Sequence, residues 1–335
     1  MSLYSDTPSI IPDNEKPTTY NNFWRSQLTI NQNGKIITIQ KAYELEYQQN
    51  QKLHHQMRKL AFDAIPSDKY ILFVNSTSRG IVGSPEFDFI DKDRQEYLFK
   101  IETGSSEINK QEFLDRNISY CLGLPYGDNR LRFFHAFSDD TNTIDWSLCV
   151  GVILSGGEIN VHETDKAHEA ALQNILSIIK QSQHLPRLGI CLGAQALAYS
   201  LGYKVTWVTD SNGEKKFTSG IEKITQTPES ILSGVGDLYV AENHAQGIEK
   251  TTSTNKDVSV MAESNLGYIE MFQSDKSLGV QFHPEVSLAR IDIGKSMRGK
   301  HTASDLEEIF KHDLSTVREK VFSYFLNQIK LDTTD

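Results

Sequence analysis

Two kinds of apolar pattern alternate along the second half of the chain. Residues 148–154 and 187–190 are short apolar runs, which is typical of strands buried on both faces of a parallel sheet. Residues 165–183 and 192–201 instead carry apolar side chains at helical spacing. Strands that alternate with helices in this way predict an α/β fold built on a mostly parallel sheet.

The first part of the chain has a different pattern. Two short apolar segments flank Asn33-Gly34, a pair that favours the positive φ of a hairpin turn. Residues 41–64 then repeat apolar side chains at helical spacing, which predicts an amphipathic helix. The apolar run at residues 70–75 predicts the first buried strand of the main domain. A weaker signal places one helix near residues 107–118.

Beyond Gly202, which we expect to end a helix, the pattern predicts strands in hairpins and meanders added to the edge of the sheet. These strands are expected at residues 204–208, 238–240, 258–262, 267–272 and 278–282. The tail predicts two more helices. We therefore divide the chain into an N-terminal extension of hairpin plus helix (1–66), a main domain (67–300) and C-terminal helices packed on that domain (301–335).

Charge and composition narrow the range of partners. The 335 residues include 34 basic and 44 acidic side chains, a formal net charge of −10, without a run rich in Lys or Arg. Nucleic acid and anionic membranes are therefore poor partners. The longest apolar runs are too short to span a bilayer, and the N-terminus lacks the pattern of a secretory signal.

The cysteines and histidines predict neither a disulfide framework nor a metal site. Cys121, Cys149 and Cys191 cannot all pair within one chain and lack the spacing of a zinc knuckle. We expect a reducing, cytoplasmic location, with secretion by a route that needs no N-terminal signal left open. The histidines outside the motifs described below show no metal-ligand pattern. We therefore expect no metal and no cofactor.

The most informative segment is GICLG at residues 189–193, where a predicted strand gives way to a helix. The spacing G-x-C-x-G is the thiol form of the nucleophile elbow, in which larger side chains two residues either side would collide with the turn. Such a turn lifts the thiol of Cys191 off the sheet at the positive end of a helix. It also lets the backbone N–H of Leu192 face a developing oxyanion. Taken alone, the segment fits a buried, inert cysteine about equally well.

A second segment, VQFHPE at residues 280–285, ends another predicted strand. Side chains two residues apart share one side of an extended chain, so the carboxylate of Glu285 can reach the imidazole of His283. Glu285 would then hold one tautomer of the ring and stabilise the imidazolium. His283 would take the proton of the thiol and later give it to a leaving amine.

Together these segments resemble class I glutamine amidotransferases. GICLGAQ at 189–195 is similar to the nucleophile segment of that family, and GVQFHPE at 279–285 to its histidine–glutamate segment. LSGG at 154–157 is similar to its oxyanion strand, and the order of the three segments is the same. The resemblance extends over about residues 70–290 and suits one flavodoxin-like domain of about 200 residues.

The resemblance implies a flavodoxin-like, doubly wound, mostly parallel sheet and a glutaminase reaction. Cys191 would attack the side-chain amide of glutamine, or of another γ-glutamyl compound, to form a γ-glutamyl thioester that water cleaves. The N–H groups of Leu192 and Gly157 would hold the oxyanion. Gly156 and Gln195 would belong to the substrate site, although packing in the first helical turn is the simpler role for Gln195.

Two positions depart from, or add to, the family pattern. Glu158 follows the double glycine, where the family usually carries proline. A changed substrate preference, dependence on a partner and a neutral substitution all stay open.

The segment AENHAQGI at 241–248 resembles a substrate-side loop of free-standing γ-glutamyl hydrolases in the same superfamily. It would place His244 in the pocket with Gln246 nearby, and solvent exposure is the alternative.

Three functions stay open. The first is a glutamine amidotransferase that passes ammonia to a separate synthase chain, because no acceptor-activating domain and no GxxxxGK[ST] loop is visible. The second is a stand-alone γ-glutamyl hydrolase or peptidase with the same triad. The third is a non-catalytic binding or regulatory protein on this scaffold, against which the complete Cys/His/Glu set argues. Homo-oligomer formation is also left open.

Overall fold

The computed structural model describes residues 29–32, 35–77, 81–107, 109–162, 165–250, 258–297 and 303–334. The chain forms two compact units, each assembled from segments that are distant in the sequence. The first unit draws on residues 1–52, 79–113 and 286–313, and the second on residues 53–78, 114–285 and 314–335. The domain boundaries expected at residues 66 and 300 stay a prediction.

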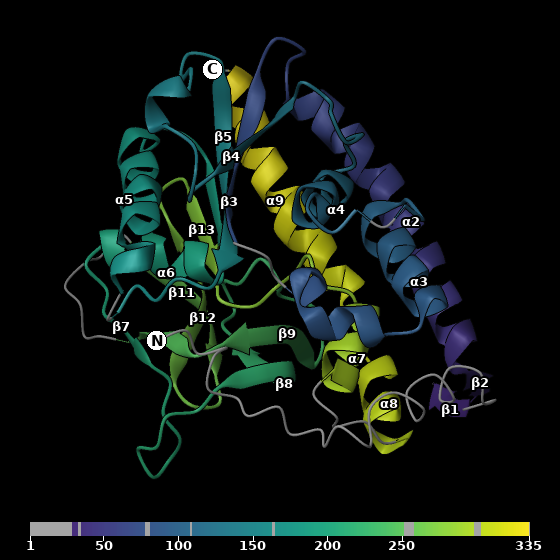
Figure 1. The fold of residues 1–335 in the computed structure, drawn as a ribbon. Coiled ribbons are helices and arrows are strands. Elements are labelled where there is room, and N and C mark those ends of the chain that lie inside the picture. Colours follow the sequence, from purple (N-terminus) through teal and green to yellow (C-terminus); the bar gives the residue numbers. More distant parts are fainter. Residues whose placement is uncertain are drawn as a thin grey trace. The chain divides into compact units, whose positions relative to one another are not determined.

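The second unit is built on an eleven-stranded sheet (Figure 1). Its parallel strands lie in the order β4–β3–β5–β6–β13. They are β3 (Tyr70–Ser76), β4 (Leu131–His135), β5 (Cys149–Gly157), β6 (Arg187–Ile190) and β13 (Ser277–Val280). Numbered along the chain, this is the order 2-1-3-4-5 of a flavodoxin-like sheet. The predicted α/β fold is therefore confirmed.

Antiparallel strands extend this sheet beyond β13 in the order β12–β11–β8–β9, and β10 pairs with both β12 and β7. They are β7 (Val205–Trp207), β8 (Thr218–Gln226), β9 (Leu238–His244), β10 (Gln246–Glu249), β11 (Val258–Ser264) and β12 (Tyr268–Ser274). The hairpins expected at the sheet edge are present. The sequence analysis missed β8 and β10, because β8 is half-exposed along most of its length and β10 has only 4 residues.

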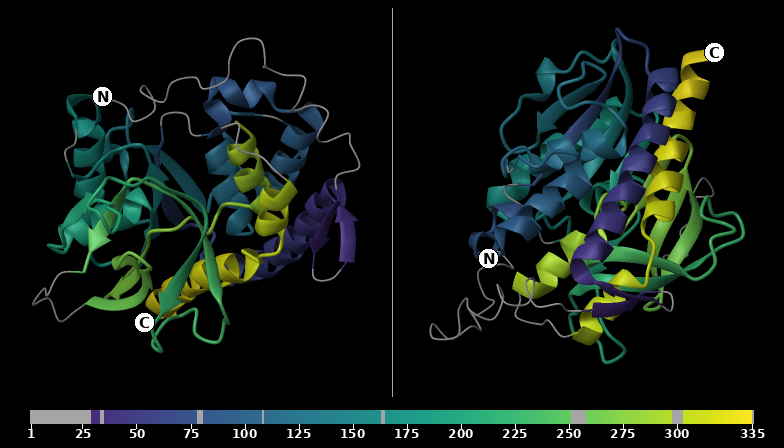
Figure 2. Two further views of the ribbon diagram at one scale, coloured as in Figure 1. Left: turned by 90° about the horizontal axis from the view of Figure 1, so that it is seen from below. Right: turned by 90° about the vertical axis from the view of Figure 1, so that its right-hand side faces the viewer.

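Helices cover both faces of the parallel strands (Figure 1). On one face lie α5 (Lys166–Gln181) and α6 (Leu192–Ser200), and on the other lie α4 (Phe113–Cys121) and α9 (Ser315–Thr334). The second half of α2 (Ile39–Ala64) runs beside α9 (Figure 2). The helix predicted near residues 107–118 thus begins later, at the start of α4.

Strand β3 shows how one segment serves two cores. Leu72 and Val74 pack in the apolar cluster that includes α5 and α6, whereas Ile71 and Phe73 pack in the cluster that includes α9. Because successive side chains of a strand point to opposite faces, a continuous apolar run is needed to fill both clusters.

The first unit contains the predicted hairpin, whose strands β1 (Thr29–Gln32) and β2 (Lys35–Thr38) pair antiparallel. The predicted turn residues Asn33 and Gly34 lie outside the described residues. The unit also contains short 3₁₀ turns, η1 (Ile81–Gly83) and η2 (Pro85–Phe89), and the helices α3 (Lys92–Thr103), α7 (Leu288–Met297) and α8 (Ala303–Phe310). The sequence analysis missed α3 and α7, whereas the two helices that it predicted in the tail are present as α8 and α9.

A buried ionic network joins α2, α3 and α7 within the first unit. Nη2 of Arg94 lies 2.6 Å from Oδ2 of Asp292 and 3.0 Å from Oγ of Ser296. The hydroxyl of Tyr43 donates a hydrogen bond to the same carboxylate.

Across the described residues, none of the helices is long and apolar enough to cross a membrane.

Candidate active site

The strand β6 and the helix α6 meet at Cys191, in a turn with unusual backbone geometry. Cys191 has a φ of 50° and a ψ of −106°, a combination that L residues rarely adopt. A Cβ on Gly189 would lie 2.6 Å from the carbonyl carbon of Gly193, and a Cβ on Gly193 would lie 2.3 Å from the carbonyl oxygen of Leu154. Both positions therefore require glycine. The backbone strain is concentrated at the residue that carries the thiol.

The side chains of Cys191 and His283 meet over Gly156. A Cβ on Gly156 would lie 2.8 Å from Cε1 of His283 and 3.4 Å from Cβ of Cys191. Nδ1 of His283 lies 2.8 Å from Oε1 of Glu285. The glycine at this position thus leaves the space in which the thiol, the imidazole and a substrate carbonyl could approach one another.

The electrostatics of His283 favour its charged form. Burial lowers the pKa of His283, but the negative charges of Glu285 and Cys191, together with the hydrogen bond to Glu285, raise it well above its ordinary value. A charged imidazolium beside the carboxylate of Glu285 is the state that this arrangement favours. Such a ring can donate a proton to a group that lies against it.

A chain of amides leads to the sulfur of Cys191. Nε2 of Gln281 lies 3.7 Å from Sγ of Cys191, and Nε2 of Gln195 lies 3.2 Å from Oε1 of Gln281. Nε2 of Gln195 also lies 2.8 Å from the backbone carbonyl oxygen of Gln246. The sequence analysis did not select Gln281, which is fully buried, because the residues that it contacts lie 86 and 90 positions away in the sequence.

The two predicted oxyanion residues are neighbours. A Cβ on Gly157 would lie 3.0 Å from Cδ2 of Leu192 and 2.2 Å from the carbonyl oxygen of Ser76. Gly157 ends β5, and Glu158 follows it as a half-buried residue. The roles of the two N–H groups in holding an oxyanion, and the effect of Glu158, stay predictions.

Helices hold the backbone of the His-x-Glu segment. Nε of Arg318 in α9 donates to the carbonyl oxygen of Pro284 at 2.9 Å, and its Nη2 donates to that of Glu285 at 3.3 Å. Nδ2 of Asn117 in α4 donates to the same Glu285 carbonyl at 3.2 Å. Neither residue lies near the motif in the sequence, so local patterns could not have identified them.

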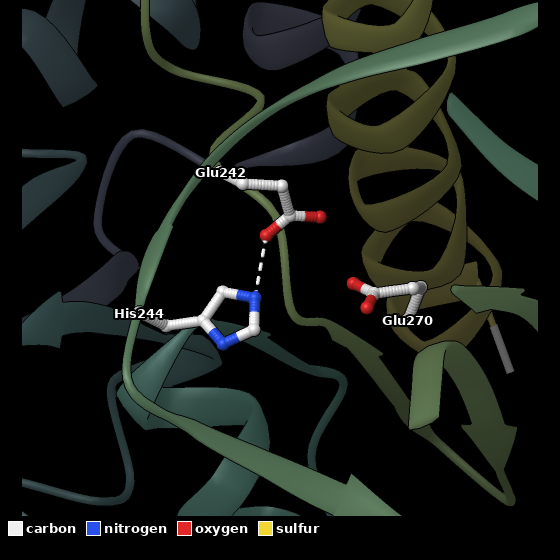
Figure 3. A group of neighbouring side chains, drawn as sticks. All are labelled: Glu242, His244 and Glu270. Carbon is white, nitrogen blue, oxygen red and sulfur yellow. Dashed lines mark ion pairs between the residues drawn. The ribbon is translucent and has the colours of Figure 1, made fainter. Parts of the chain in front are cut away.

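A second group of ionisable side chains lies in the same unit (Figure 3). Glu242 and His244 project from β9, and Glu270 projects toward them from β12. Nε2 of His244 lies 2.8 Å from Oε2 of Glu242, and its Nδ1 lies 2.8 Å from the carbonyl oxygen of Gln246. His244 is only 6% exposed, so the solvent-exposed alternative was wrong. Its place in a substrate pocket stays a prediction.

Burial dominates the charge state of this group. Burial raises the pKa of Glu242 to about 7, and burial together with the charge of Glu242 raises that of Glu270 well above its ordinary value. Burial lowers the pKa of His244. The sequence analysis selected only His244 here, although Glu242 stands two residues before it and so shares its side of the strand.

Comparison with known proteins identifies the family. Residues 130–294 match the model of glutamine amidotransferase class-I. A glutamine-hydrolyzing GMP synthase subunit from Picrophilus torridus is 31% identical over 152 residues, which are 44% of this chain and 74% of that protein. The chain therefore belongs to the class I glutamine amidotransferase family.

Larger relatives share only this part of their length. The glutamine-hydrolyzing GMP synthase of Saccharomyces cerevisiae is 29% identical over 167 residues, which are 47% of this chain and 29% of the yeast protein. The chain thus matches less than a third of that enzyme. A glutamine amidotransferase from Thermotoga maritima covers 79% of this chain and 97% of its own, with a TM-score of 0.48 and 18% identity.

Proposed function

We propose that this chain hydrolyses the side-chain amide of glutamine through a γ-glutamyl thioester on Cys191. The observation that supports this most strongly is the strained elbow that holds Cys191 beside His283 at the N-terminus of α6. The sulfur attacks the carbonyl carbon, and the protonated His283 gives its proton to the departing ammonia. His283 then takes a proton from the water that cleaves the thioester, while Glu285 holds the ring in place.

The remaining predicted residues form the surroundings of the reacting carbonyl in this proposal. The N–H groups of Gly157 and Leu192 bind the oxyanion, where fixed donors stabilise the developing charge. Gly156 leaves room for the substrate. Gln195 acts on the site by ordering Gln281 and the carbonyl of Gln246.

We also propose that the ammonia passes to a separate synthase chain. The Picrophilus relative is named as a subunit of a GMP synthase, and this chain covers 74% of it. The alternative is a stand-alone γ-glutamyl hydrolase with the same triad. The segment 241–248, in which His244 is buried, supports this alternative. A panel of γ-glutamyl amides and peptides distinguishes them, because only the hydrolase should cleave these compounds and leave glutamine intact. The predicted cytoplasmic location suits either activity and stays a prediction.

The central test is ammonia release from glutamine by the full chain and by Cys191→Ala. We expect the variant to lose turnover and keep its fold, as measured by circular dichroism. Cys149→Ala is the matched control, because burial raises the pKa of the Cys149 thiol to about 11 and keeps it an unreactive thiol. Unchanged turnover in Cys191→Ala would refute the nucleophile. If neither glutamine nor any γ-glutamyl compound is cleaved, with or without cell extract, the non-catalytic alternative holds.

A further inference from the structure

The group formed by Glu242, His244 and Glu270 has the properties of a cation site rather than of ordinary core. The three residues are 4%, 6% and 2% exposed, respectively. Each offers one ligand atom, and these atoms all lie within 4.8 Å of one another (Figure 3). Two carboxylates therefore converge on one imidazole nitrogen in an environment that excludes water.

The ligand atoms in this group lack hydrogen-bond partners. Within the part of the chain that the structure describes, both carboxylate oxygens of Glu242, Nε2 of His244 and Oε2 of Glu270 are buried without one. A neutral imidazole whose Nδ1–H donates to the Gln246 carbonyl has a bare lone pair at Nε2. That lone pair faces Oε2 of Glu242 at 2.8 Å. Two acceptors at this distance repel each other unless a proton or a cation lies between them.

The imidazole is also oriented as a ligand. A metal-binding histidine usually donates its other ring N–H to a carbonyl or carboxylate, which fixes the tautomer and the ring direction. Here the carbonyl of Gln246 accepts that bond. The side chain of Gln246 is itself fixed, because its Nε2 lies 2.6 Å from the carbonyl oxygen of His162 and its Oε1 lies 3.2 Å from the backbone nitrogen of His162.

We propose that Glu242, His244 and Glu270 bind one divalent first-row transition ion, such as Zn²⁺ or Mn²⁺. A donor set of one imidazole nitrogen and two carboxylates suits these ions, whereas Mg²⁺ and Ca²⁺ prefer oxygen alone. Two carboxylates with a neutral imidazole also match a charge of +2. Ligand atoms about 2.0–2.2 Å from an ion lie about 3.4 Å apart in tetrahedral geometry. Small side-chain rotations therefore complete the site and leave a fourth position open.

The ion would link two strands that are not neighbours in the sheet. Glu242 and His244 lie on β9 and Glu270 on β12, and the strands β11 and β8 separate them in the hydrogen-bonding order. An ion bound only by the folded chain stabilises that chain in proportion to its affinity and concentration. We therefore expect the ion to raise the melting temperature.

The test is ion content of the chelator-treated full chain after equilibrium dialysis against Zn²⁺ or Mn²⁺, measured by plasma mass spectrometry. We expect one ion per chain and a higher melting temperature. Glu270→Gln and His244→Gln should each weaken binding by about 100-fold or more, since even outer-shell changes cost about 10–100-fold. Glu222→Gln is the matched control. The charge of Glu222 acts on all three residues, but its side chain supplies no ligand atom. The affinity of Glu222→Gln for the ion should therefore stay within about threefold of the wild-type value.

One further variant separates this site from the thiol. Cys191→Ala should retain the ion, and X-ray absorption should show nitrogen and oxygen ligands without sulfur. Absence of stoichiometric binding by the folded wild-type chain would overturn the site and leave the two carboxyls sharing a proton. Binding that survives Glu270→Gln but disappears in Cys191→Ala would also overturn it. Ion content does not depend on turnover, so the result stands whether or not the chain hydrolyses glutamine.

Discussion

Two buried groups of charged side chains, one in each unit, balance their charges differently. In the first unit, Arg94 lies 2.6 Å from Asp292 and the hydroxyl of Tyr43 donates to the same carboxylate. In the second unit, Glu242 and Glu270 converge on His244, with Glu222 adding a further negative charge nearby. The opposite charges of the first group offset each other. The second group needs a proton or an ion.

The difference separates a structural role from a chemical one. Burying two opposite charges costs desolvation that their attraction and hydrogen bonds offset, so such a pair holds elements together without further partners. Burying like charges shifts their proton affinities, which is the usual condition of groups that bind ions or move protons. His283, between Cys191 and Glu285, has neighbours of opposite charge, like the first group, but those neighbours would take part in the proposed reaction.

The largest effect is expected for His283→Ala on turnover. Loss of a general acid–base group costs about 10²–10⁴-fold in rate, so ammonia release should fall by that factor while the melting temperature changes little. His184→Ala, at an exposed position, is the control and should keep full activity. If His283→Ala instead lowers the melting temperature, and the chains that stay folded keep the wild-type rate of ammonia release, His283 has a structural role.

The next effect concerns the first unit and is measured as stability. Asp292→Ala leaves Arg94 buried without its carboxylate, so the free energy of unfolding should fall by about 3–5 kcal/mol. Asp305→Ala removes the partner of a half-exposed pair with Lys295 at 3.6 Å and should cost less than about 1 kcal/mol. Chemical denaturation followed by circular dichroism compares the two. Equal losses would show that burial does not distinguish these pairs.

A smaller effect is expected at Glu285. Its negative charge is one cause of the raised pKa of His283, so Glu285→Gln should lower that pKa and slow turnover less than His283→Ala does. The pKa of His283 is higher in the folded chain than in the unfolded chain. The charged ring therefore makes its full contribution to the free energy of unfolding below about pH 6.5, and this contribution is lost as the pH rises through the raised pKa. Histidine NMR across the alkaline range measures the pKa of His283 in the wild-type chain and in the variant. A pKa that stays or rises in the variant would contradict the assigned contact.

The smallest effect is expected for Glu270→Gln in ion-free protein. This nearly isosteric change replaces a buried carboxyl whose pKa is raised well above its ordinary value by an amide that cannot ionise, so stability should stay the same or rise by about 1 kcal/mol. The contrast is with the large loss expected for Asp292→Ala. A loss of about 3 kcal/mol or more in Glu270→Gln would mean that its carboxylate is already balanced, as in the first unit.

The parts of the molecule that the sequence predicted are those fixed by local geometry. The glycines around Cys191 follow from the steric limits of one tight turn, and the contact between His283 and Glu285 follows from two positions on one extended segment. The parallel strands β3, β5, β6 and β13 were visible because burial on both faces demands continuous apolar runs. The parallel strand β4 was missed, because its side chains are only partly buried and the sequence gives no such run. The flavodoxin-like order rested on the family resemblance.

The parts that escaped prediction depend on contacts between distant segments. Gln281 and Arg318 act through hydrogen bonds to residues 33–90 positions away, which no local spacing encodes. Glu270 stands between apolar neighbours in β12 and becomes informative only once β9 brings Glu242 beside it. A charged side chain inside an otherwise apolar strand is the local signal that such a residue has a partner from elsewhere in the chain.

The most direct measurement is mass spectrometry of the full chain after rapid acid quenching of its reaction with glutamine. A γ-glutamyl adduct should appear on the peptide that contains Cys191 and be absent from Cys191→Ala, in which ammonia release also stops. Steady ammonia release from glutamine by Cys191→Ala, with no adduct on the wild-type cysteine, would contradict covalent catalysis at this position.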